Sequence, residues 1–304
     1  MLKQIIYIAG EGRSGSTILD RTLGGIEGVS SFNEMHVILK PDYLDEQLCS
    51  CGEPPDQCPF WTAVNADLAR DFDLDRMQKL SAKFDRSGAM PRLFFGLIWG
   101  NTRRELREYA AFCKAQMEAI AYHAECDTIV DSSKVPTRSL ILRRYADLDV
   151  YTIHLVRHPG AVAASWARKK VDPSLKGDMT QYSKNRSYGV WIYKQLTSEL
   201  LRFGGPYLPL RYEKFAKSPR STVTEIMNFV PGLMDRETRF LSEREVDLPP
   251  LHSLSGNPDR FQSGPTEIRE DKKWKSAEAG GLGIWSVILF PFMLRYGYAG
   301  RDPS

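Results

Sequence analysis

Short apolar runs alternate along this chain with stretches in which apolar residues recur at helical spacing. Residues 4–9 (QIIYIA) are β-branched and aromatic, which is typical of a buried strand. Residues 16–23 (STILDRTL) follow with apolar positions on one helix face. The pattern continues, and we expect further strands at 127–131, 150–156 and 207–212 and helices at 63–84, 103–125, 159–169 and 219–229.

Strands and helices in alternation predict a parallel sheet with helices on both faces. The expected fold class is therefore α/β, a three-layer fold with a central parallel sheet flanked by helices, plus a helical insertion at about 40–125. No linker rich in proline, glycine or serine divides the 304 residues. We expect a single domain over 1–304, ending in a separate segment at about 250–304.

The composition favours a globular protein, with 42% hydrophobic and 26% charged residues. A net charge of +3 is too small to indicate nucleic acid or a membrane as the main partner, but it suits an anionic cofactor. The longest apolar stretch, 284–294, contains a proline and is too short for a transmembrane segment. The first strand begins almost at residue 1, which leaves no room for a cleavable signal segment, so we expect a cytoplasmic protein.

Residues 10–20 (GEGRSGSTILD) have the glycine spacing of an ATP-binding P-loop. Gly10, Gly15 and Thr17 match that pattern, but Ser16 stands where such a loop has its lysine, and the basic residue is Arg13. Such a strand–loop–helix unit can wrap one phosphate in backbone N–H groups, so the fold is expected to be P-loop-like. The alternative is a glycine–serine turn without a ligand. The expected binding residues are Gly12, Arg13, Ser14, Gly15, Ser16 and Thr17.

A nucleotide whose 5′-phosphate carries one small leaving unit suits this loop better than a triphosphate does. Other polar residues follow the remaining strands, at 131–134 (DSSK), 157–159 (RHP) and 211–213 (RYE). Because ligands of open α/β sheets bind at the carboxyl ends of the strands, we expect these segments and the loop to form one site.

Cys49, Cys51 and Cys58 lie close together in the segment 49–61 (CSCGEPPDQCPFW). This spacing resembles a zinc cluster, but the segment holds only these three sulfurs and no histidine. A closed four-ligand site would need a distant partner such as Cys113, Cys126 or a histidine. The favoured interpretation is a structured loop with reduced or redox-labile thiols. No carboxylate cluster suggests Mg²⁺ either, so no metal is expected.

The sequence resembles the sulfotransferases that use 3′-phosphoadenosine-5′-phosphosulfate (PAPS). The loop at 10–17 is similar to their 5′-phosphosulfate loop, in the arginine-bearing form of Golgi-type carbohydrate and tyrosylprotein members. Residues 155–165 (LVRHPGAVAAS) are similar to their 3′-phosphate motif. The resemblance implies that Arg157 offers a planar fork to that phosphate and that Ser165, about two helical turns on, adds a hydroxyl donor.

Further segments resemble the family in the same order along the chain. Residues 131–134 are similar to the segment with a catalytic lysine, here Lys134, and Tyr212 matches a tyrosine near the adenine or ribose. Residues 255–260 (SGNPDR) resemble the late loop that closes over the 3′-phosphate, and 271–274 (DKKW) the segment after it. These two segments add Gly256, Asn257, Arg260 and Lys272 to the expected cofactor contacts. Structural alternatives remain: a packed aromatic ring for Tyr212, a turn for Asn257 with the proline after it, a solvated basic face for Lys272, and an ion pair with a core carboxylate for Arg157.

The acceptor hydroxyl needs a base, and charge on the departing phosphate needs cations. The segment 31–36 (SFNEMH) lies where related members carry a glutamate base, so Glu34 is the first candidate and His36 its rival. Arg13 and Lys134 are expected to stabilise the developing charge, which makes a metal unnecessary. The acceptor pocket is expected from 33–60, 86–101 and 171–188.

The resemblance therefore implies an enzyme that transfers a sulfuryl group from PAPS to an acceptor hydroxyl, with 3′-phosphoadenosine-5′-phosphate (PAP) as product. A carbohydrate or small-molecule metabolite is the expected acceptor, and the oligomeric state is open. One alternative is a P-loop nucleotide-dependent phosphotransferase, which would need Mg²⁺ and the missing loop lysine. The other is a non-catalytic nucleotide-binding module.

Overall fold

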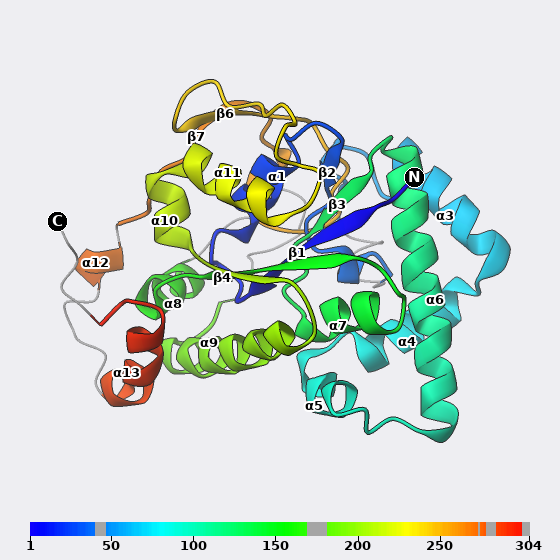
Figure 1. Cartoon of the computed structure of the whole chain (residues 1–304), viewed down its shortest axis with the longest axis horizontal. Helices are drawn as coiled ribbons and strands as arrows, with labels where there is room; N and C mark the ends of the chain where they lie inside the picture. The colour runs from blue at the N-terminus through cyan, green and yellow to red at the C-terminus, as the bar shows by residue number, and fades with distance from the viewer. Residues whose placement is uncertain (40–46, 169–180, 273, 278–283, 300–304) are drawn as a thin grey trace.

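A five-stranded parallel sheet forms the centre of the computed structural model, which describes residues 1–39, 47–168, 181–272, 274–277 and 284–299 (Figure 1). Its strand order is β2-β3-β1-β4-β5, and every neighbouring pair is parallel. The strands are β1 (Gln4–Gly10), β2 (Val29–Ser31), β3 (Thr128–Asp131), β4 (Val150–Val156) and β5 (Tyr207–Arg211). The predicted α/β class and parallel sheet are confirmed.

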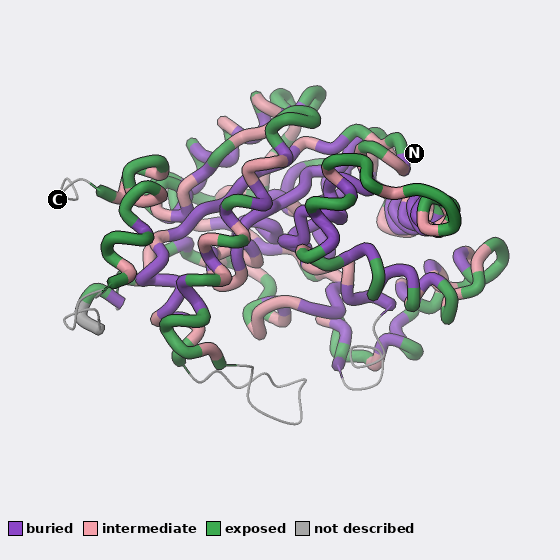
Figure 2. Tube along the Cα trace, turned by 90° about the horizontal axis from the view of Figure 1, so that it is seen from below, coloured by how far each residue is buried: buried purple, intermediate pink, exposed green. Residues whose placement is uncertain are grey.

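Alternating side chains of β1 enter two separate cores, as a strand covered on both faces requires. Ile6 and Ile8 belong to one hydrophobic cluster, and Ile5, Tyr7 and Ala9 to another. Figure 2 shows the buried residues along the centre of the molecule and the exposed ones on its outer turns. The three-layer arrangement expected from the sequence is therefore present.

The helices divide between the two faces according to these clusters. On the side of Ile6 lie α1 (Ser16–Leu23), α10 (Tyr212–Lys217) and α11 (Pro219–Phe229). On the side of Ile5 lie α3 (Pro59–Asp71), α4 (Leu74–Phe84), α5 (Met90–Phe94), α6 (Gly100–His123) and α7 (Pro136–Arg144). A third cluster joins α8 (Pro159–Ala167), α9 (Lys184–Glu199) and α13 (Trp285–Arg295).

Several predicted bounds are close to those observed, but one expected helix is wrong. The segment 63–84 forms two helices because the chain is extended at Phe72 and Asp73, and the Asp73 carboxylate caps α4 by accepting the Arg76 N–H at 3.1 Å. Not predicted were β2, α7, α9 and the antiparallel pair β6 (Glu245–Leu248) and β7 (Gly264–Glu267). Position 169 of the predicted helix at 159–169, and parts of 33–60 and 171–188, lie outside the described residues.

The first βα turn depends on two glycines at positive φ. Gly10, at φ +127°, ends β1 so close to β4 that a Cβ would lie 2.2 Å from the Leu155 carbonyl oxygen. Gly15, at φ +84°, precedes α1, and a Cβ there would lie 2.3 Å from the Tyr212 ring. The turn therefore packs against the ends of β4 and β5. Within the described ranges, no helix combines the length and apolar character needed to cross a bilayer.

Candidate active site

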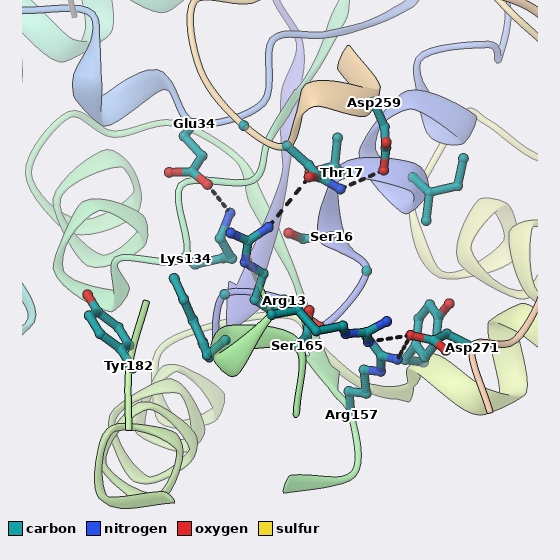
Figure 3. Close-up of a pocket in the computed structure, with 18 of the residues that line it drawn as sticks. Arg13, Ser16, Thr17, Glu34, Lys134, Arg157, Ser165, Tyr182, Asp259 and Asp271 are labelled. Atoms are coloured by element: carbon teal, nitrogen blue, oxygen red, sulfur yellow. Dashed lines mark hydrogen bonds and ion pairs between the residues drawn. The ribbon is translucent and has the colours of Figure 1, made fainter. Parts of the chain in front are cut away.

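A cavity of about 480 Å³ lies at the carboxyl ends of β1, β3, β4 and β5, where the sequence predicted a common site. Figure 3 shows Glu34 and Lys134 at one end, Arg157 and Asp271 at the other, and Arg13 between them. Its described lining consists of Gly12, Arg13, Gly15, Ser16, Thr17, Ile18, Glu34, Gln47, Lys134, Arg157, Ser165, Trp166, Arg168, Tyr182, Tyr212, Gly256, Asn257, Asp259 and Asp271.

The phosphate loop brings the start of α1 to this cavity. Ser16 and Thr17, the first residues of that helix, line the cavity, so the positive end of the helix dipole faces it. Arg13 has a left-handed backbone at φ +62°, and its guanidinium lies 4.9 Å from the centre of the Trp166 ring. Loop and helix together offer a cradle for one anionic group.

Arg157 extends from the end of β4 and is held from several sides. Its Nη1 donates to the Arg13 carbonyl at 2.9 Å, and the guanidinium lies 4.7 Å from the Tyr212 ring centre. Its Nη2 lies 3.6 Å from Asp271 Oδ2, the same oxygen that accepts from Arg168 Nη2 at 2.6 Å. Ser165, on α8, lines the same end of the cavity. Two arginines thus converge on a carboxylate, in a place suited to a phosphate.

Lys134 and Glu34 meet at the other end. Lys134 Nζ donates to Glu34 Oε1 at 2.7 Å and to the Ser132 carbonyl at 2.6 Å. The lysine is buried, with φ +56°, whereas Glu34 is partly exposed to the cavity. A carboxylate and an ammonium group are therefore available at one point of the cavity wall.

A buried ion network fixes the backbone that carries Lys134. Arg138 donates from Nε to Asp131 Oδ2 at 2.7 Å, from Nη1 to Asp85 Oδ2 at 2.9 Å and from Nη2 to Gln116 Oε1 at 2.9 Å. Asp131 Oδ1 in turn accepts the Ser133 N–H at 2.9 Å. All of these charges are paired, as buried charges must be. The turn after β3 is thus held by residues of α6 and α7 and by Asp85, which directly follows α4.

Glu11 and Lys194 were not among the expected site residues. Glu11 is only 4% exposed, and this burial raises its pKa to about 7 although the Lys194 and Lys134 ammonium groups oppose the shift. Lys194, on α9, donates to the Lys134 carbonyl at 2.7 Å, and burial lowers its pKa. A buried carboxyl and a buried ammonium group of opposite charge therefore lie behind the residues that line the cavity. The sequence feature that could have indicated Glu11 is an acidic residue within the glycine loop.

Residues 249–271, called the late segment here, complete the cavity beside the phosphate loop. Arg13 Nη1 donates to Asn257 Oδ1 at 3.5 Å. Arg21, a buried residue of α1, donates to the carbonyl of Asp259 at 2.7 Å and to that of Pro249 at 3.1 Å. Helix α1 therefore holds both the phosphate loop and the segment that faces it.

A family model described as "Sulfotransferase family" matches residues 5–233 of this chain. The chain belongs to the sulfotransferase family. A sulfotransferase domain from the curacin biosynthetic pathway is similar to it in structure, with 18% identity over 93% of each chain and a TM-score of 0.47. So are the sulfotransferase domain of the Synechococcus PCC 7002 olefin synthase, with 21% identity over 75% and 74% of the chains and a TM-score of 0.40, and a sulfotransferase from Alicyclobacillus acidocaldarius, with 13% identity over 97% and 95% and a TM-score of 0.39.

Most residues expected from the sequence lie together in this sulfotransferase, and a few do not. Ser14, within the loop, is buried, and Arg260 is buried with Nη1 donating to the Gly256 carbonyl at 3.2 Å. Lys272 is exposed, 3.6 Å from Glu270. The His36 N–H donates to Ser133 Oγ at 3.1 Å. None of these four is among the described lining residues.

Several lining residues of the sulfotransferase had no individual sequence signal. Trp166 and Arg168 come one and three positions after Ser165, and Tyr182 stacks on Trp166 with ring centres 4.5 Å apart. Asp259 and Asp271 belong to segments that the resemblance had indicated, although neither was named as a site residue. Their positions depend on tertiary contacts with arginines rather than on local pattern.

Proposed function

We propose that this sulfotransferase transfers the sulfuryl group of PAPS to a hydroxyl of a carbohydrate or small-molecule metabolite and releases PAP. The observation that carries the proposal is the single cavity shared by a lysine-free phosphate loop, Arg157 with Ser165, and the Glu34–Lys134 pair. Membership of the family supplies the reaction class. The cytoplasmic location and a reaction without metal stay predictions that accompany it.

The two ends of the cavity take different parts of the donor. The loop Gly12–Thr17 and the start of α1 hold the 5′-phosphosulfate, while Arg157 and Ser165 hold the 3′-phosphate. Tyr212 packs near the adenine or ribose. Gly256 and Asn257 close over the nucleotide, Arg260 holds that loop through the Gly256 carbonyl, and Ser14 and Lys272 stay predicted contacts.

The reaction is an in-line displacement at sulfur. Glu34 accepts the proton of the acceptor hydroxyl as the acceptor oxygen attacks sulfur, and the bond from sulfur to the bridging phosphate oxygen breaks. The electron pair of that bond leaves with the phosphate, where Arg13 and Lys134 stabilise the charge. Glu34 is preferred over His36 because it lines the cavity and contacts Lys134.

Calorimetric titration with PAP and with ATP, each with and without Mg²⁺, tests the proposal. We expect PAP to bind without metal and ATP to bind weakly, because Ser16 replaces the loop lysine. Arg157→Ala should weaken PAP binding roughly 10- to 100-fold through loss of a charged fork. Arg220→Ala removes an exposed arginine paired with Glu243 and serves as the control. A preference for ATP with Mg²⁺ would instead support a phosphotransferase.

A further inference from the structure

Three thiols and one imidazole converge outside the active site. Cys49, Cys51 and Cys58 come from the loop before α3, and His252 comes from a segment about two hundred residues later. Their ligand atoms all lie within 4.8 Å of one another. The sequence had left such a site short of a fourth ligand, and His252 is a histidine from a distant part of the chain.

Three of the four closest distances within this Cys–His cluster equal those between the ligands of one tetrahedral ion, and the fourth is a few tenths of an ångström shorter. Cys58 Sγ lies 3.7 Å from Cys49 Sγ and 3.7 Å from Cys51 Sγ. His252 Nδ1 lies 3.2 Å from Cys58 Sγ and 3.8 Å from Cys49 Sγ. Bond lengths of about 2.3 Å for zinc–sulfur and about 2.0 Å for zinc–nitrogen place tetrahedral ligands roughly 3.5–3.8 Å apart. A disulfide would need sulfurs about 2.05 Å apart, and these cysteines are free.

We propose that Cys49, Cys51, Cys58 and His252 bind one zinc ion in a closed structural site. Three thiolates and an imidazole are a donor set that zinc prefers in such sites. Backbone hydrogen bonds bring the cysteines of this loop together: Cys49 N–H donates to the Glu53 carbonyl at 2.8 Å, and Gly52 N–H, at φ +97°, donates to the Cys49 carbonyl at 2.8 Å. Because all four protein ligands are present, the site has no open position for catalysis.

The segment that carries His252 is bonded directly to the cysteine loop. Ser50 N–H donates to the Ser253 carbonyl at 2.9 Å, and Ser253 N–H donates to Ser50 Oγ at 2.8 Å. The His252 ring stacks on Phe60 with centres 5.1 Å apart, and its carbonyl accepts from Trp61 Nε1 at 2.9 Å. A metal ion would therefore fasten the late segment to the start of α3.

This fastening reaches the cavity within a few residues. Ser253 Oγ accepts from Asn33 Nδ2 at 2.9 Å, and Ser255 Oγ donates to the Glu34 carbonyl at 3.1 Å. Gly256 and Asn257, which follow, line the cavity. The zinc ion thus positions the wall that carries Glu34 and Asn257; this consequence, unlike metal binding itself, rests on the proposed function.

The test begins with the full chain, purified without strong chelators and analysed for metal by mass spectrometry. We expect one zinc per chain in the unmodified protein, retained in Cys126→Ser, which alters a buried cysteine outside the cluster. Cys58→Ser and His252→Ala should lose the bound zinc. Co²⁺ exchanged into the unmodified protein should show the thiolate charge-transfer and visible bands of a tetrahedral site, a readout that needs no variant to fold.

Unmodified protein that contains no zinc, and takes up neither Zn²⁺ nor Co²⁺ after thiol reduction, would overturn the proposal. So would peptide mapping that finds two of the three loop cysteines joined in a disulfide in freshly isolated protein. PAP titration of the same sample separates this inference from the proposed function. If the protein binds PAP but neither contains nor takes up zinc, the zinc site is wrong and the proposed function stands. If it contains zinc but does not bind PAP, the proposed function is wrong and the zinc site stands.

Discussion

Three of the five described residues other than glycine that have a left-handed backbone lie in or next to the cavity wall. Arg13, Asn33 and Lys134 have φ values of +62°, +56° and +56°. Such conformations cost free energy and persist where surrounding contacts impose them. Arg13 and Lys134 are the two cations proposed to stabilise the leaving group, and Asn33 precedes the proposed base. The strained positions therefore coincide with two side chains to which the proposal gives catalytic roles and with the residue before a third.

Glu34→Gln keeps the size of the side chain and removes its basicity. We expect the rate of sulfuryl transfer, measured with radiolabelled PAPS and a responsive acceptor, to fall by about 10²–10⁴-fold, the usual contribution of a general base. PAP affinity should change little, because Glu34 lies at the end of the cavity away from Arg157. If His36→Ala gives the larger loss, the assignment of the base moves to His36. Unchanged turnover in both variants would show that neither residue is the base, whereas unmodified protein that binds PAP but transfers no sulfuryl group would favour a non-catalytic module.

Glu11 predicts a pH dependence of stability. Its pKa rises from 4.5 to about 7 on folding because of burial, so the folded chain holds a proton that the unfolded chain releases. The stabilisation is complete below pH 4.5 and is lost as the pH rises through 7. Glu11→Gln should therefore raise the free energy of unfolding at pH 8 by up to about 3 kcal/mol, with little difference at pH 4. Urea unfolding at both pH values measures this, with the exposed Glu27→Gln as control; equal effects at both values would contradict it.

At the scale of elements, the phosphate loop depends on how closely the start of α1 approaches Tyr212, the first residue of α10. Gly15→Ala combines an unfavourable φ of +84° with a Cβ 2.3 Å from the Tyr212 ring, so the ring or the loop must move. Gly232→Ala is the matched control: φ is +74°, but no described atom lies within 4 Å of the added Cβ. We expect Gly232→Ala to cost about 1–2 kcal/mol of stability without affecting PAP binding. Gly15→Ala should cost more and weaken PAP binding; equal effects in both measurements would show that packing at Gly15 is unimportant.

The junction between the late segment and α8 yields another prediction. Asp271 places its carboxylate between Arg157 and Arg168, where the proposal puts the 3′-phosphate. Asp271→Asn removes a negative charge that competes with the ligand, so PAP should bind several-fold more tightly in calorimetry, and less so at high salt. Asp247→Asn, at an exposed pair with Arg239, should have no effect. Weaker binding by Asp271→Asn would mean that the carboxylate orients the arginines for the ligand.

Elements with a strong local signal could be predicted from the sequence, and those defined by partners could not. Residues 4–23 carry an apolar strand, a glycine loop and a helical face in succession. Arg157 and Ser165 lie in a second strand–turn–helix unit, Arg157 just after the strand and Ser165 in the helix. In contrast, β2 has three residues and is a strand only through its pairing with β3. The meeting of Cys58 with His252 likewise depends on a contact between distant segments, which no local spacing specifies.

At the scale of the molecule, the cavity is built from segments far apart in the chain. The loop at 12–17, Lys134 after β3, Arg157 after β4 and Asn257 in the late segment line one space. The sheet fixes the first three, because parallel strands end at one edge. The late segment has no strand in this sheet and is held by α1 through Arg21 and by the Cys–His cluster. Because the sheet does not hold the late segment, we expect bound ligand to stabilise it more than the other three segments of the cavity.

Hydrogen–deuterium exchange with and without PAP measures this stabilisation. Ligand bound between the loop and the late segment should slow amide exchange in both 12–17 and 255–260, because local opening must then break ligand contacts as well. Exchange in α4, which packs in the core below the sheet and does not line the cavity, should stay the same. Arg157→Ala at the same PAP concentration should reduce the protection of both segments together. Protection of 12–17 without any change at 255–260 would show that the late segment takes no part in holding the nucleotide.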